Sequence, residues 1–201
     1  MADSSCLSCF KEGKVFEVIL SSGTNMTPVG VVRKGNILRF KLFQGRSMEE
    51  LRKGGNAILQ PVNDVELLVR LALNLPANFR RGRLEGIDFI RGEPWILGRV
   101  EVRLSYLEDE LGRSKILDCV FHPITCSLRI KDVRPVSRAD LYLLEMGVDV
   151  TRLLEAHKRK RVEIAHELRV RILENYRRYK RLGGDSEVAD YVLSLVSDTK
   201  V

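Results

Sequence analysis

The sequence of 201 residues has no long hydrophobic run and none of the common catalytic motifs. No stretch approaches the roughly 20 apolar residues that a membrane-spanning helix needs. There is no G-x-S-x-G, no Walker loop, no G-x-G-x-x-G and no H-E-x-x-H. Only three histidines occur, His122, His157 and His166, and two of them lie in a highly charged segment. These absences argue against a membrane protein and against the hydrolases, nucleotide-binding proteins and zinc proteases that those motifs mark.

The N-terminal residues also lack the basic and then apolar segments of a signal peptide. The composition, 44% hydrophobic and 30% charged, is typical of a folded globular protein. We therefore expect a cytoplasmic protein with one large domain, or with a domain and an appendage. If the chain is an enzyme, a cofactor is expected to carry the difficult chemistry.

Four cysteines are present, Cys6, Cys9, Cys119 and Cys126. In a cytosolic chain of this length we do not expect a disulfide scaffold. Together with His122 they offer enough ligands for a tetrahedral zinc site. The alternative is a frayed N-terminal pair and two small apolar strand residues. We favour that alternative and predict no metal, because the second group lacks the tight spacing of a zinc knuckle.

The formal net charge is +7, and the excess lies in one segment. Residues 152–181 carry eleven Lys or Arg against four Glu. Such a segment could bind nucleic acid or an acidic partner. The same segment has the spacing of an amphipathic helix, with an apolar stripe formed by Val162, Ala165, Leu168, Ile172 and Tyr176. We favour a solvated helical face and keep a non-enzymatic nucleic-acid-binding module as the alternative function.

The first part of the chain alternates with the period of strands separated by turn residues. Strand candidates are residues 14–22, 26–35, 37–43, 56–62, 94–107 and 114–122. A turn at residues 110–113 joins the last two. A short helix is expected at residues 47–53, and a second follows an Asn or Asp cap within residues 63–75. Residues 76–86 are expected to form a basic loop.

From Ser137 onward the apolar spacing is helical. The helices expected there are residues 137–157, 158–182 and 186–196, with Gly183 and Gly184 before the last. A run of strands followed by a run of helices predicts an α+β fold. We expect an antiparallel body over residues 1–135 and a helical subdomain of about three helices over residues 136–201.

The sequence Gly45-Arg46-Ser47 lies between a strand and a short helix. A glycine, a guanidinium and a hydroxyl at a helix start suit a bound phosphate. Ser47 and Glu50 also have the spacing of a capping box, which needs no ligand. On these residues the plain cap is favoured, although both arrangements can coexist.

A second candidate is residues 25–31, where Pro28 and Gly30 interrupt a strand-like run. Proline removes a backbone donor and glycine removes a side chain. This predicts an interrupted or edge strand whose bare backbone can lie against a flat ring. An ordinary edge strand with a bulge is the alternative, and it is favoured on these residues alone.

Five segments in the same order resemble a largely archaeal family of proteins with an FMN-binding split β-barrel. They are FEVILSS with TPVGV, then FQGRSMEEL, VNDVELLVRLAL, SRADLYLLEMGVDVTRLLE and RLGGDSEVA. That fold is shared more distantly with flavin reductases and pyridoxamine phosphate oxidases. The resemblance extends from about Val15 to Val196 and implies FMN as cofactor, a homodimer and a flavin-dependent oxidoreductase. The substrate is not implied.

The resemblance also implies site residues. Arg46 and Ser47 would hold the phosphate, with Gly45 allowing close approach. The flavin ring would lie along Thr27, Pro28, Val29 and Gly30. Asn63 and Arg138 would reach the ligand from the second helix and from the helical subdomain. Three positions depart from the family pattern: Met48 replaces an aromatic residue, Ser137 replaces Asn, and Glu50 replaces Asn. Glu50 matters most, because an acid there would weaken phosphate binding unless it points away.

Overall fold

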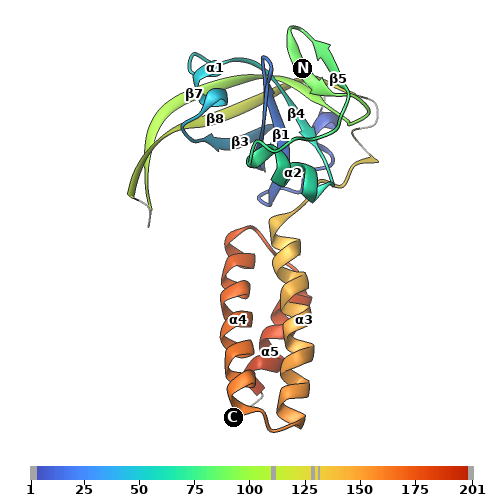
Figure 1. Ribbon diagram of the computed structural model, residues 1–201, viewed down its shortest axis with the longest axis vertical. Coiled ribbons are helices and arrows are strands. Elements are labelled where there is room, and N and C mark those ends of the chain that lie inside the picture. Colours follow the sequence, from blue (N-terminus) through green and yellow to red (C-terminus); the bar gives the residue numbers. More distant parts are fainter. Residues whose placement is uncertain (1–3, 110–111, 128–129, 131, 199–201) are drawn as a thin grey trace. The chain divides into compact units, whose positions relative to one another are not determined.

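The computed structural model describes residues 4–109, 112–127, 130 and 132–198. The chain divides into two compact units, Met1–Val136 and Ser137–Val201. The strands belong to the first unit and the three long helices to the second (Figure 1).

The first unit is built mainly from strands. Its strands are β1 (Val15–Ser22), β2 (Asn25–Lys34), β3 (Ile37–Leu42), β4 (Gly55–Pro61), β5 (Arg81–Leu84), β6 (Ile87–Ile90), β7 (Ile96–Asp109) and β8 (Gly112–Cys126). Its helices are the 3-10 helix η1 (Ser4–Leu7), α1 (Arg46–Glu50) and α2 (Val65–Ala72). The predicted cap of the second helix is confirmed, since the Asp64 carboxylate accepts a hydrogen bond from the Leu67 amide at 2.9 Å.

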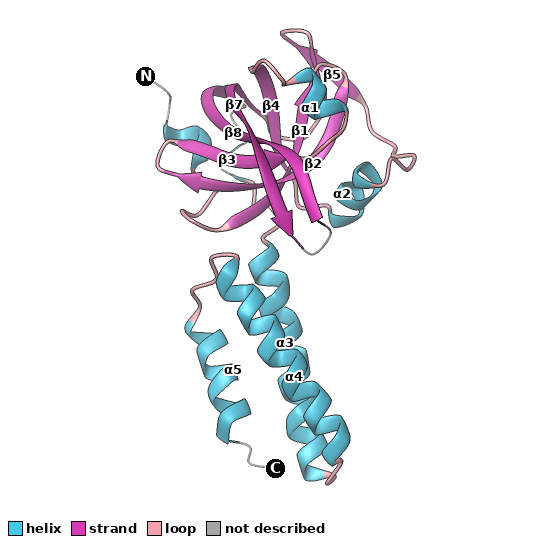
Figure 2. Ribbon diagram, turned by 90° about the vertical axis from the view of Figure 1, so that its left-hand side faces the viewer, coloured by secondary structure: helices cyan, strands magenta, loops and turns pink. Residues whose placement is uncertain are grey.

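Six of these strands form a closed barrel in the order β1-β2-β3-β8-β7-β4. Every pairing between them is antiparallel. The barrel and the three C-terminal helices confirm the predicted α+β fold with an antiparallel β-barrel (Figure 2). The register of β7 and β8 also supports the predicted turn between them, although residues 110–111 of that turn lie outside the described part of the chain.

Strand alternation divides the apolar residues between two faces. One set fills the barrel, and Val18, Leu20, Val31 and Phe121 in it are fully buried. The other face of β1 carries Ile19, which packs with residues of α2 and β6. The barrel therefore has an interior core and an outer apolar layer under α2, the helix that lies beside the barrel in Figure 2.

The pairing between β2 and β3 covers only one end of β2. Val32 to Lys34 pair with Ile37 to Arg39, and β3 then continues along β8 as far as Leu42. Within the described chain, the rest of β2 pairs with β1 alone. The predicted edge strand is thus confirmed for the half of β2 that contains Pro28. A proline fits there because it has no N–H to offer a second neighbour.

The basic loop expected at residues 76–86 is wrong in part, because residues 81–84 form β5. This strand pairs with β6 across a two-residue turn at Glu85 and Gly86, where φ is 49° and 78°. Positive φ at both positions is the geometry of a type I′ hairpin. Buried Gln60 holds the hairpin on the barrel, since its amide donates to the Ile90 carbonyl (3.0 Å) and accepts from the Ile90 N–H (2.7 Å). The strand was missed because it is short and rich in arginine.

The expectation for the cysteines is wrong in part, although Cys119 is a buried apolar residue of β8 as expected. Cys6 and Cys126 form a disulfide, and Cys6 lies in the barrel core with Phe10. The N-terminal segment is therefore packed and not frayed. Cys9 and Cys119 are free, and burial raises the pKa of these thiols to about 11 and about 12. Among the described residues, no three His, Cys, Asp or Glu side chains gather as a metal site requires.

The second unit contains α3 (Arg138–Lys158), α4 (Val162–Arg181) and α5 (Glu187–Asp198). These confirm the three predicted helices. Their apolar faces form one core, which includes Met146, Leu168, Ile172 and Val192. One member of the predicted stripe is misplaced, because Val162 begins α4 and is 59% exposed. In the described chain, no helix is long and apolar enough to span a bilayer.

Some basic side chains of the second unit have acidic or aromatic partners. The Arg171 guanidinium donates to both carboxylate oxygens of buried Asp149. Arg159 pairs with Glu155 one helical turn away, and Lys180 pairs with Asp190 at 3.1 Å. Hydrogen bonds from Tyr176 and then from Lys180 lower the pKa of the Asp190 carboxyl. Part of the positive charge is thus neutralised within the helices.

Candidate functional site

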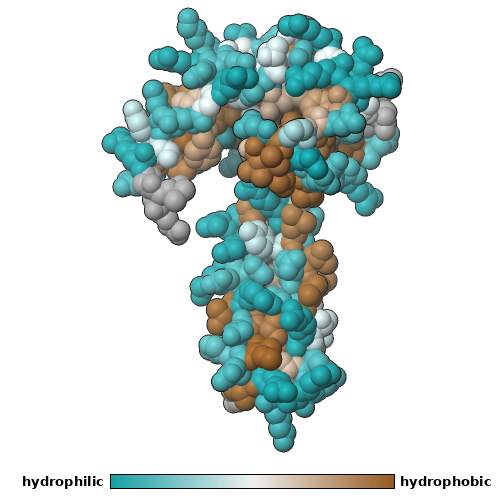
Figure 3. Space-filling model, viewed as in Figure 1, coloured by the Kyte–Doolittle hydropathy of each residue, from teal (hydrophilic) through white to brown (hydrophobic). Residues whose placement is uncertain are grey.

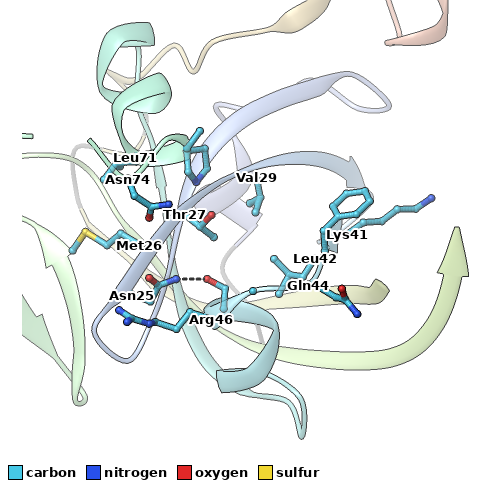
Figure 4. Close-up of a pocket in the computed structure, with 15 residues that line it drawn as sticks. Asn25, Met26, Thr27, Val29, Lys41, Leu42, Gln44, Arg46, Leu71 and Asn74 are labelled. Carbon is cyan, nitrogen blue, oxygen red and sulfur yellow. Dashed lines mark hydrogen bonds between the residues drawn. The ribbon is translucent and has the colours of Figure 1, made fainter. Parts of the chain in front are cut away.

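A pocket opens where β2 loses its second neighbour. It has a volume of about 550 Å³ and is bounded by β2, the end of β3, the start of α1 and the end of α2 (Figure 4). It is lined by Asn25, Met26, Thr27, Pro28, Val29, Lys41, Leu42, Phe43, Gln44, Gly45, Arg46, Ser47, Leu71, Ala72 and Asn74. The two segments that the sequence singled out, around Pro28 and around Arg46, are therefore brought to one site.

The β2 wall exposes backbone to the pocket. Thr27, Pro28 and Val29 lie on the half of the strand that has no pairing with β3. Thr27 and Val29 face this space in Figure 4. Backbone that lacks a strand neighbour can offer its N–H and C=O groups to a ligand. This wall suits a flat group that binds along a strand edge.

The α1 wall begins at Gly45, whose φ is 153°. Residues with a side chain rarely adopt this conformation, and a Cβ built there would meet open space. Glycine is therefore required by the backbone turn itself. The open space beside it leaves room for another molecule to approach the chain.

The predicted capping box at Ser47 and Glu50 is wrong. The N-cap of α1 is Gly45, and Ser47 lies within the helix. The Ser47 hydroxyl instead accepts a hydrogen bond of 2.6 Å from the Asn25 side-chain amide (Figure 4). This bond links the first residue of β2 to α1 across the pocket. A hydroxyl that accepts one bond can still donate another, so Ser47 remains able to bind a ligand.

Glu50 points away from the pocket. Its carboxylate accepts a hydrogen bond of 2.6 Å from the Ser22 hydroxyl at the end of β1. It lies beside Gly23, since a Cβ there would come within 3.6 Å of Glu50 Oε1. The departure from the family pattern at this position therefore does not place an acid at the site.

The charged side chains among the described lining of the pocket are basic. Lys41 and Arg46 line it and are exposed, and neither has an ion pair within the described part of the chain. No Asp or Glu is among its described lining residues. Arg46 lies near the Asn25–Ser47 bond, and Lys41 extends away from it (Figure 4). An anionic group is expected at the Arg46 end, where amide and hydroxyl groups adjoin the guanidinium.

Sequence reasoning missed the wall formed by the end of α2. Leu71, Ala72 and Asn74 close the pocket there. Asn74 follows the helix with φ of 54°, a left-handed conformation that asparagine tolerates after a helix. The asparagine after an apolar helical run was the available signal for this turn. Its proximity to β2 is a tertiary contact that spacing does not reveal.

Three predicted site residues do not line the pocket. Gly30 follows Val29 in β2 and pairs with Glu17 of β1. Asn63 is exposed and immediately precedes the cap of α2. Arg138 is the first residue of α3 in the second unit. Their roles toward a ligand stay predictions.

The sequence of the barrel unit matches a known protein family. Residues 16–129 match the N-terminal domain of a protein family of unknown function, DUF447. This match covers more than half of the chain. The chain belongs to the DUF447 family. The matched region contains the whole candidate pocket, from Asn25 to Asn74.

Several solved structures are similar to this DUF447 chain. An FMN-bound DUF447 protein from Methanosarcina mazei is 23% identical, with a TM-score of 0.48, over 98% of this chain and 99% of that one. The styrene monooxygenase flavin reductase of Pseudomonas putida is 16% identical, with a TM-score of 0.42, over 60% and 82%. Nitrilotriacetate monooxygenase component B from Bacillus cereus is 11% identical, with a TM-score of 0.40, over 56% and 69%. No curated protein matches the chain.

The Asn25–Ser47 bond predicts a measurable coupling in this DUF447 chain. Asn25→Ala and Ser47→Ala should each lower the free energy of unfolding, and the double variant should lose less than their sum. We expect a coupling energy of about 1 kcal/mol, the usual net value of a hydrogen bond. Urea unfolding of the four proteins measures it. As a control, Ser47→Ala combined with Asn56→Ala should be additive, because the Asn56 amide bonds to Glu85. Full additivity of the first pair would contradict the bond.

Proposed function

We propose that this protein binds FMN in the pocket between β2 and α1. The observation that carries the proposal is a strand edge open to a cavity, with the Arg46 guanidinium, which has no ion pair among the described residues, at one end. The same ligand is bound by the Methanosarcina mazei protein, which is assigned to the same family.

The residues present fit both halves of FMN. The volume of about 550 Å³ lies within the range of roughly 300–1,000 Å³ that cofactor sites occupy. Thr27, Pro28 and Val29 would hold the flat ring system through their backbone. Arg46 and Ser47 would hold the phosphate, a group that matches the fork of a guanidinium. The absence of a carboxylate from the described lining removes a source of repulsion.

We propose further that the protein is a flavin-dependent oxidoreductase. Bound FMN supplies hydride or electron transfer. Among the described residues that line the pocket there is no His, Cys, Tyr, Asp or Glu, which leaves Lys41 as the candidate general acid or base in that lining. The side chains that line the pocket would bind and orient the cofactor, and they would leave one side of it open to a second reactant. Within this proposal the unit Met1–Val136 is the FMN-binding domain. Gly30, Asn63 and Arg138 would contact the cofactor, although they are not among the described residues that line the pocket.

We do not extend the proposal to nucleic-acid binding by the helices. Arg171, Arg159 and Lys180 are held by carboxylates of the same unit. Arg178 lies over the Tyr142 ring at 5.8 Å. Side chains in such pairs are less available for phosphate contacts than a free basic stripe is.

We also propose that two copies of the chain form a homodimer through α2. Val65 and Val69, with Leu73 after the helix, are spaced by four residues and are 46%, 50% and 63% exposed. An apolar stripe of this kind on a surface helix favours a partner. Because α2 also closes the candidate pocket, such a dimer would place the two cofactor sites beside the interface.

The phosphate contact is tested by changing Arg46. When FMN is added to the wild-type protein and the unbound FMN is then removed, the protein should retain the absorption bands of flavin. Arg46→Ala should fold normally and bind FMN about ten-fold more weakly or worse, because a charge-assisted hydrogen bond is lost. Flavin fluorescence titration measures the affinity.

Two control variants define this result. Arg39→Ala removes an exposed arginine of β3 that does not line the pocket, and it should leave the affinity unchanged. Glu50→Gln should also change the affinity by less than about two-fold, since Glu50 points toward Ser22. Equal losses in Arg46→Ala and Arg39→Ala would remove Arg46 from the site. A protein that retains no FMN at all would overturn the proposal.

The dimer is tested by light scattering after size-exclusion chromatography. The wild type should elute with twice the mass of the chain, and Val69→Glu should elute with the mass of one chain. Leu144→Glu changes an equally apolar residue of α3 that is 63% exposed, and it should leave the dimer intact. A wild-type protein that is monomeric at all concentrations, or a dimer that survives Val69→Glu, would contradict the assignment.

A further inference from the structure

The β7–β8 ribbon carries one apolar face from the barrel core out into solvent. Residues that pair directly in an antiparallel ladder share a face. Val100 pairs with Phe121 and Val102 with Cys119, and these side chains belong to or pack against the barrel core. The next pair on that face is Leu104 with Leu117, and the one after it is Tyr106 with Lys115.

The barrel ends before this face does. The pairing of β4 with β7 reaches only Val100, and the pairing of β3 with β8 begins at Leu117. Beyond these points the ribbon consists of two strands, which extend past the rest of the barrel in Figure 1. Leu104 and Tyr106 are accordingly 51% and 55% exposed. Apolar side chains gather where the ribbon passes α1 (Figure 3).

This exposed part of the face and α1 enclose a second cavity of about 490 Å³. Its lining residues are Gln44, Gly45, Met48, Glu49, Arg52, Val102, Leu104, Lys115 and Leu117. Buried Met48 and Leu117 form an apolar floor with half-buried Val102. The volume and the concave apolar floor are those of a small-molecule site. A docked protein surface would need a larger area than this cavity supplies.

The charged residues of the cavity are two cations and one acid. Lys115 is half-buried and Arg52 is exposed, and neither has an ion-pair partner within the described chain. Glu49 is exposed and likewise has none there. The excess of one positive charge favours a monoanion, and Glu49 disfavours a group with several negative charges such as a phosphate. A cation that is half-buried above apolar side chains suits a ligand with one charged end and one apolar end.

We propose that this cavity is a second ligand site, which binds an amphipathic carboxylate with an aromatic or short aliphatic body. The carboxylate pairs with Lys115 and Arg52, and the body lies on Met48, Val102, Leu104 and Leu117. The site is separate from the pocket on the other side of Gln44 and Gly45, the two residues that line both cavities. The assignment does not depend on FMN binding.

The test uses 2-naphthoate as probe, with its neutral relative 2-naphthamide, and isothermal titration of the full chain. We expect one naphthoate per chain and weaker binding of the amide by at least five-fold. Lys115→Gln should weaken naphthoate binding at least five-fold. Leu104→Ser removes an exposed apolar contact and should weaken both probes.

Matched variants show where the probe binds. Lys53→Gln removes a neighbouring exposed lysine that does not line the cavity, and it should have no effect. Arg46→Gln changes the other pocket and should also have no effect. The proposal is overturned if naphthoate does not bind, if the amide binds equally well, or if Arg46→Gln weakens binding while Lys115→Gln does not. The last result would place the probe in the first pocket.

Discussion

The site depends on one constraint, the limited pairing between β2 and β3. A closed barrel normally satisfies the backbone groups of every strand on both sides. Here β3 pairs with β2 over three residues and then follows β8. Within the described residues, half of β2 is left with one strand neighbour, and Pro28 occupies that half without the loss of a ladder hydrogen bond to β3. The barrel thereby keeps a packed interior and has an open strand edge at the pocket.

Other features follow from this opening. The chain after β3 turns at Gly45 into α1, and the Asn25–Ser47 hydrogen bond spans the gap in place of strand pairing. The end of α2 covers the third side. The way in which these three walls meet places Arg46 at the open edge of β2. It also leaves no acid among the described residues that line the pocket.

Local patterns predicted much of the fold. The alternation in β1 and β3 and the three-and-four spacing in α3, α4 and α5 gave elements of the correct type. The β5 strand was missed because its exposed positions are arginines and its length is four residues. The disulfide was missed because the chain was taken as cytosolic, where disulfides are rare, and because nothing in the sequence shows that Cys6 and Cys126, 120 residues apart, lie close in space.

In the site too, local features were predicted and contacts between distant segments were missed. Pro28 and Arg46 were singled out from local chemistry, and both line the pocket. Glu50 was assigned to the wrong partner because the capping-box spacing is a local rule, whereas its hydrogen bond is to Ser22, 28 residues earlier. Leu71 and Asn74 reach the site only through the packing of α2 against β2. Patterns within one element could be read, but contacts between elements could not.

The central claim is that FMN occupies the opening beside β2. The most direct test is an NMR titration of the isotopically labelled protein with FMN, which follows the backbone amides. The account predicts that the largest shifts fall on Thr27, Val29, Gly45, Arg46 and Ser47, with smaller ones at the end of α2. The absence of shifts, or shifts concentrated elsewhere on the barrel or on the helices, would contradict it.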